Sequence, residues 1–130
     1  MKTLFPVIIV VVALVLVCSC ASGAAVNGGE PSWAGIYTGV TPAADCPGIV
    51  MVVILNAEGR YKITRQYIDR DDHVFSDTGA YVYDEKTKGL FLDGRNIPSY
   101  RVGKNTITIL DGEGNEISSG FAHMLILKKL

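Results

Sequence analysis

Apolar and polar residues alternate with a period of two along much of the chain after residue 32. Between residues 60 and 67, Tyr61 and Ile63 alternate with polar neighbours, and Ile107 and Ile109 alternate with threonines. A period of two with one polar face is typical of an antiparallel sheet that packs on one side and meets water on the other. The pattern therefore predicts an all-β fold.

Turn-forming residues divide the same region into about eight short predicted strands. The predicted strands are residues 33–40, 48–56, 60–67, 79–83, 89–92, 99–102, 106–110 and 121–128. Residues 49–55 and 124–127 are apolar at successive positions, which predicts strands that are covered on both faces. Because closing a meander removes its exposed edges, we predict a small antiparallel barrel whose first and last strands pair.

The N-terminal part of the chain has a different pattern. Lys2 precedes an apolar run at residues 4–17, and a run of about 14 residues has the length of a signal-peptide core. It is shorter than the roughly 17–25 residues of a membrane-spanning helix. The sequence VCSC at 17–20 then resembles a lipobox, in which a small residue precedes the cysteine that is lipidated.

This resemblance implies a lipoprotein signal peptide at residues 1–19 and a covalent lipid on Cys20. An ordinary secretory signal, cleaved between residues 21 and 25, is the alternative. Ala21 stands where an aspartate would retain a Gram-negative lipoprotein in the inner membrane, so we expect a cell-envelope protein held at the outer membrane by its lipid. Residues 20–32 are rich in Ser, Gly, Ala and Asn, which predicts a flexible tether before a domain at 33–130.

The charge and the motifs of the sequence argue against two functional classes, nucleic-acid-binding proteins and enzymes. The chain has 12 Lys and Arg against 13 Asp and Glu, and no basic patch stands out along the sequence, so nucleic acid is not an expected partner. We find no Ser-His-Asp arrangement with a nucleophile elbow, no phosphate-binding loop and no His-Glu-x-x-His motif. We therefore do not expect an enzyme.

Cysteine usage leaves one thiol in the predicted mature domain. Cys18 would leave with the signal and Cys20 would carry lipid, so Cys46 has no partner for an internal disulfide. Such a leftover cysteine is a buried structural thiol, a metal ligand or an intermolecular partner. The side chains that could join it in a soft-metal site are Met51, His73, His123 and Met124. Because His123 and Met124 are neighbours on a predicted strand, they would point to opposite faces, and a four-ligand metal site is not expected.

Three further groups of residues have a structural and a functional interpretation. The acidic segments 69–73 and 111–116 contain carboxylates that a hard cation could use, but we interpret them as a solvated hairpin loop and a glycine turn. The aromatic residues are Trp33, Tyr37, Tyr61, Tyr81, Tyr83 and Tyr100. They fit the core or rim of a small barrel better than the lining of a cavity for a small apolar ligand.

Segments across the domain resemble the NlpE N-terminal domain family. The resemblance lies in WAGIYTGV at 33–40 and PAADCPGI at 42–49, with looser matches in GRY at 59–61, DTG at 77–79 and LDGEGNEI at 110–117. It implies a barrel similar to half a lipocalin, and an outer-membrane lipoprotein linked to copper resistance and to envelope-stress signalling on surface contact.

The chain departs from the family pattern at one important position. Ala43 stands where the family has the first cysteine of a Cys-x-x-Cys pair, which leaves Cys46 alone. A pair of thiolates can bind Cu(I) or form a disulfide, and a single cysteine can do neither unaided. The sequence also ends at Leu130, before the second domain of longer members, so signalling that depends on that domain is not expected here.

The leading hypothesis is thus a non-enzymatic NlpE-like envelope lipoprotein that senses envelope stress, copper stress or a surface through an envelope protein partner. One alternative is a lipocalin-like carrier of a small apolar ligand. The other is a copper-binding protein that uses Cys46.

Overall fold

The computed structural model describes residues 31–130, which form eight strands and one short 3₁₀ helix. The elements are β1 (Gly35–Thr41), β2 (Ile49–Leu55), β3 (Arg60–Tyr67), β4 (Val74–Asp84), β5 (Gly89–Leu92), β6 (Tyr100–Gly103), β7 (Thr106–Ile109), η1 (Ala122–Leu125) and β8 (Ile126–Lys129). The predicted signal peptide, Cys20 and most of the tether lie outside this range. Among the described residues, no helix is long and apolar enough to cross a membrane.

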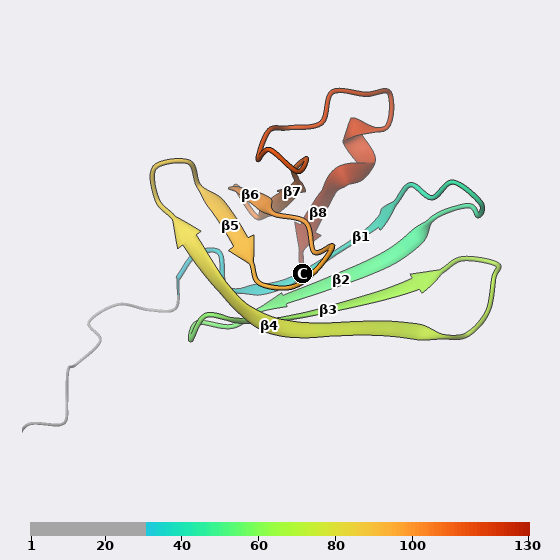
Figure 1. Cartoon of the computed structure of the whole chain (residues 1–130), viewed down its shortest axis with the longest axis horizontal. Coiled ribbons are helices and arrows are strands. Elements are labelled where there is room, and N and C mark those ends of the chain that lie inside the picture. Colours follow the sequence, from blue (N-terminus) through green and yellow to red (C-terminus); the bar gives the residue numbers. More distant parts are fainter. Residues whose placement is uncertain (1–30) are drawn as a thin grey trace, which may run out of the picture.

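Each strand pairs antiparallel with the next, and the sheet closes where β8 returns to β1 (Figure 1). At this seam Tyr37 pairs with Lys129 and Thr38 pairs with Lys128. The closed meander confirms the predicted fold class, including the pairing of the first and last strands.

Two strands begin more than two residues away from the predicted position. β4 begins at Val74 rather than at residue 79 because its first half pairs with β3, down to the pair of Val74 and Gln66. The prediction of one strand at 121–128 is wrong in its first half. There the chain turns as η1, with the Met124 amide donating to the Phe121 carbonyl at 2.9 Å, and only Ile126–Lys129 finds partners in β7 and β1.

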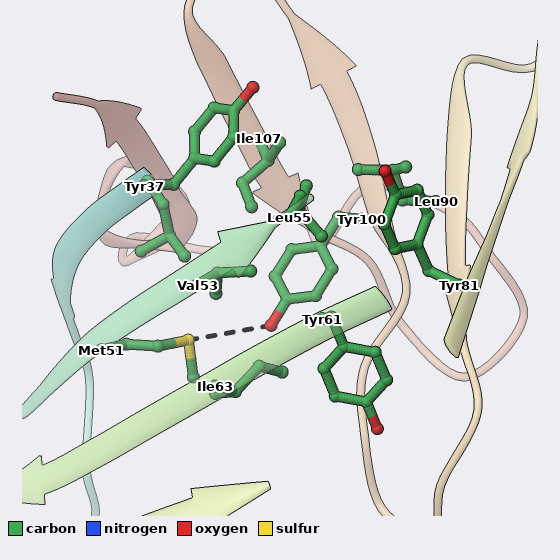
Figure 2. Close-up of a cluster of buried hydrophobic side chains, with 11 residues drawn as sticks. Tyr37, Met51, Val53, Leu55, Tyr61, Ile63, Tyr81, Leu90, Tyr100 and Ile107 are labelled. Carbon is green, nitrogen blue, oxygen red and sulfur yellow. Dashed lines mark hydrogen bonds between the residues drawn. The ribbon is translucent and has the colours of Figure 1, made fainter. Parts of the chain in front are cut away.

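The barrel interior is filled by side chains from every strand (Figure 2). The buried core consists of Tyr37, Met51, Val53, Leu55, Tyr61, Ile63, Tyr81, Leu90, Tyr100, Ile107 and Leu127. Four of these are tyrosines whose rings supply much of the apolar volume. Trp33 and Tyr83 are partly buried against this core, so the aromatic residues form core and rim as expected.

The expectation that residues 49–55 are covered on both faces is wrong. On β2, Val53 and Leu55 point inward and are fully buried, whereas Val50 on the opposite face is 37% exposed. The same holds for β8, where Leu127 is buried and Ile126 is exposed. An apolar outward face favours the strand conformation, but no second layer within residues 31–130 covers this wall.

The up-and-down order gives the barrel two distinct ends. The entry end contains residues 31–34 and the hairpins β2–β3, β4–β5 and β6–β7, and the far end contains the β1–β2, β3–β4 and β7–β8 connections. The β5–β6 connection starts beside β4, where Asp93 is hydrogen-bonded to Ala80. In Figure 1 the chain enters at the left, and the β1–β2 and β3–β4 connections lie at the right. The entry is fixed by Trp33, which stacks on Tyr83 at 3.8 Å and accepts a 2.9 Å hydrogen bond from the Tyr37 hydroxyl.

Candidate functional site

Cys46 lies in the β1–β2 connection at the far end of the barrel. Its side chain is half-buried, and its Sγ donates a hydrogen bond to the Gly48 carbonyl at 3.2 Å. Gly48 is buried, and a Cβ at that position would lie 2.6 Å from Val40 Cγ1. The turn before β2 therefore requires a glycine for close packing, and this turn holds Cys46 against its own backbone.

The charged segment 69–73 lies at the same end, in the β3–β4 connection. Arg70 pairs with Asp45 at 3.4 Å, which joins the two connections. Both side chains are more than half exposed, so the pair contributes less than about 1 kcal/mol. Asp71 accepts a 3.0 Å hydrogen bond from the His73 amide, and an open hollow of about 480 Å³ lies beside the segment.

The remaining candidates for a soft-metal site are dispersed. Met51 is 6% exposed in the core, and its sulfur accepts a 3.8 Å hydrogen bond from the Tyr100 hydroxyl (Figure 2). His73 is exposed beside Phe75, with 4.4 Å between the ring centroids. Within residues 31–130, no three His, Cys, Asp or Glu side chains lie close enough to hold a metal ion.

His123 and Met124 belong to η1 and not to a strand. The expectation that they point to opposite faces of a sheet therefore does not apply, because alternation holds only for extended backbone. His123 lines an open hollow of about 410 Å³ over the outer side of β7 and β8.

The segment 111–116 forms a tight turn around one carboxylate. Asp111 Oδ1 accepts hydrogen bonds from the Glu113 and Asn115 amides, both at 2.9 Å. Gly114 has φ +84°, a conformation that favours glycine. The Asp111 carboxylate is thus engaged by its own loop, which is the arrangement of an Asx turn.

One partly exposed ion pair at the far rim of the barrel was missed from the sequence. Arg65 Nη2 donates to Asp77 Oδ2, and both side chains face inward at the far end, since Arg65 pairs with Met51 and Asp77 with Ile63. Arg65 Nε is buried and has no hydrogen-bond partner among the described residues. The signal was available, because Arg65 is in phase with the inward-facing Ile63.

Tyr100 places a hydroxyl in the middle of the apolar core. The residue is 0% exposed, and burial raises the pKa of its phenol well above the ordinary value, although the charge of Arg65 acts in the opposite direction. The hydroxyl is therefore neutral at any physiological pH. It acts as a hydrogen-bond donor to Met51 and as part of the filled interior.

Comparisons with known proteins show which proteins resemble this barrel in sequence and fold. The sequence profile described as the NlpE N-terminal domain matches residues 37–120. A protein from Shewanella oneidensis described as a lipoprotein has a crystal structure with a TM-score of 0.68 and 35% identity, covering 75% of this chain and 88% of that protein. No curated protein sequence matches.

A second crystal structure is that of the Cpx pathway activator NlpE from Escherichia coli. The identity is 30% and the TM-score 0.58, over 67% of this chain and 47% of that protein. The chain thus matches about half of the length of that activator.

Proposed function

Because this chain belongs to the NlpE N-terminal domain family, we propose that it is a non-enzymatic lipoprotein of the cell envelope that takes part in sensing surface contact or copper stress through an envelope protein partner. The observation that carries the proposal is the family match over residues 37–120. The 30% identity to a Cpx pathway activator supports a role in envelope-stress signalling.

The proposed anchor is the lipid on Cys20. The relationship to a lipoprotein from Shewanella oneidensis supports this modification, as does the small residue Ser19 in front of the cysteine. Ala21 after the cysteine supports transfer to the outer membrane. With a lipid at residue 20, the barrel stays at the membrane surface, where a sensor of surface contact would act.

The test is a deletion of the gene in its host, with an envelope-stress reporter measured under copper and after surface contact. We expect a reduced reporter response to at least one of the two signals, restored by a plasmid copy of the wild-type gene. A plasmid copy with Cys20→Ala serves as the matched control for anchoring and should not restore the response. An unchanged response to both signals in the deletion strain would exclude the proposed role.

The carrier alternative has no supporting observation in residues 31–130. Side chains fill the barrel interior, and three open hollows in this region lie on its outside or rim.

A further inference from the structure

Lysines and most carboxylates separate along the barrel axis, whereas Arg65 and Arg70 lie among the carboxylates of the far end. Every lysine within residues 31–130 lies in the half next to the entry end: Lys62, Lys86, Lys88, Lys104, Lys128 and Lys129. The connections of the far end carry most of the acidic residues: Asp45, Asp69, Asp71, Asp72, Asp111, Glu113 and Glu116. The acidic residues of the entry end are Glu58, Asp84 and Glu85. A molecule with almost balanced charge is therefore strongly polarised.

The lysines at the entry end are free of ion pairs. In the part of the chain that the structure describes, the salt bridges all involve arginines, and Lys129 Nζ instead donates to the Ser32 carbonyl at 2.9 Å. The Asp84 carboxylate accepts bonds from the Lys86 amide and the Thr87 hydroxyl, so it caps its own hairpin. The ammonium groups of this end are thus available to an anionic partner.

The hairpins present these ammonium groups outward. Lys86 and Lys88 belong to the β4–β5 hairpin and Lys104 to the β6–β7 hairpin, and all three are exposed. Lys88 and Asn105 have φ of 56°, which makes both turns tight. Because the two hairpins leave the barrel at the same end, their lysines form one basic surface, here called the lysine end.

The chain reaches its predicted anchor from this same end. Ser32 and Trp33 are held beside the barrel by Lys129 and Tyr83. The twelve residues 21–32 span at most about 40 Å in any conformation. A lipid on Cys20 would therefore attach the barrel to the bilayer through its lysine end, within about 40 Å of the membrane surface.

We propose that the lysine end docks on the anionic phospholipid headgroups of the membrane that holds the lipid anchor. This proposal rests on the proposed anchor at Cys20. Lysines near an anionic surface are attracted within a Debye length of about 8–10 Å, and the acidic far end is repelled by the same surface. The two effects act together, so the barrel stands with the Cys46 turn and the segment 69–73 directed away from the membrane.

Trp33 provides the probe for this orientation, because it is the single tryptophan of the chain and lies at the lysine end. The acylated full-length protein is reconstituted in phosphatidylcholine vesicles and in vesicles with about 30% phosphatidylglycerol. Both contain the same fraction of a phosphatidylcholine with a nitroxide on its headgroup. We expect roughly twofold stronger quenching of Trp33 fluorescence in the anionic vesicles, and a return to the neutral level at about 0.5 M salt.

Two matched variants separate position from net charge. Lys86→Glu/Lys104→Glu and Arg70→Glu/Arg95→Glu change the net charge equally, the first at the lysine end and the second at exposed positions outside it. The first should lose the extra quenching in anionic vesicles, whereas the second should retain it. Equal thermal midpoints of the two variants and the parent verify that the barrel is intact.

Equal quenching of the acylated parent in neutral and anionic vesicles would overturn the docking proposal. If Lys86→Glu/Lys104→Glu then also lost the stress-reporter response, the lysine end would bind a protein instead. The mass of the purified protein reports acylation separately. An unmodified Cys20 would therefore refute the proposed anchor, which is distinguishable from a failure of docking.

Discussion

Tyr100 and Met51 form a polar contact in a part of the barrel that is otherwise apolar. The hydroxyl reaches the Met51 sulfur at 3.8 Å, and a thioether is only a weak acceptor. The phenol is therefore held mainly by burial of its ring, and its hydroxyl proton is retained because a phenolate would be poorly solvated there. This gives the folded state a defined response to alkaline pH.

We predict that stability falls above about pH 10 and that Tyr100→Phe reduces this fall. Burial raises the pKa of Tyr100 above that of an unfolded tyrosine. Below about pH 10 the phenol is neutral in both states, and above it the unfolded chain loses the proton first. This costs about 1.4 kcal/mol of stability per pH unit. Urea unfolding from pH 7 to 11 measures the slope.

Burial also raises the pKa of Tyr37. The Tyr100→Phe variant should therefore still lose some stability as the pH rises above about 10, because Tyr37 is unchanged. At pH 7 the Tyr100→Phe variant should lie within about 1 kcal/mol of the parent, because only one weak hydrogen bond is lost. An equal alkaline slope in the two proteins would show that Tyr100 does not determine it.

Cys46 is predicted to be dispensable for Cu(I) binding. In Cys46→Ser the hydroxyl can donate to the Gly48 carbonyl as the thiol does, so stability should change by less than about 1 kcal/mol. Competition with a Cu(I) chelator should show the same weak binding in variant and parent. The matched variant Ala43→Cys restores the Cys-x-x-Cys spacing and should bind Cu(I) more tightly. Loss of binding in Cys46→Ser would instead make Cys46 a ligand.

At the level of elements, the β1–β8 seam determines whether the sheet closes. β8 has only four residues, and its inward-facing Leu127 is 0% exposed. It packs over Gly39 of β1, where an added Cβ would lie 2.7 Å from Leu127 Cδ2. At the seam, the Leu127 side chain thus fills the space that the missing side chain of Gly39 leaves open.

Leu127→Ala should lower the free energy of unfolding by about 2–5 kcal/mol, the range for a large cavity in a packed core. Val82→Ala is the matched control, since Val82 also lies on a strand but is 68% exposed, and it should change stability by less than about 0.5 kcal/mol. Chemical denaturation of both variants measures the difference. Similar losses of unfolding free energy at the two positions would mean that the seam contributes no more to stability than an exposed strand position.

For the whole molecule, we expect the residues around Cys20 to determine the membrane to which the protein is sorted. We predict that Ala21→Asp moves the protein from the outer to the inner membrane, because an aspartate after the lipidated cysteine retains lipoproteins there. Fractionation of envelope membranes measures the distribution, and Ala21→Ser is the matched control that should stay with the parent. Unchanged fractionation of Ala21→Asp would argue against sorting by this residue.

The sequence by itself determined the fold class, most strand boundaries and the family. Alternation and turn residues are local signals, so β3 and β5 could be located to the residue. The sequence did not reveal η1, because the mostly apolar segment 121–127 has no period that distinguishes a short helical turn from a strand. It also did not reveal the first half of β4, whose strand conformation comes from pairing with β3.

Only the tertiary structure decided which distant side chains meet. The Arg65–Asp77 pair forms because two strands are in register, and the outward face of β2 stays exposed because no described layer covers it. The lysines look scattered along the sequence, and no basic patch is visible there. They gather at one end because an up-and-down barrel places alternate hairpins on the same side, which no local pattern can show.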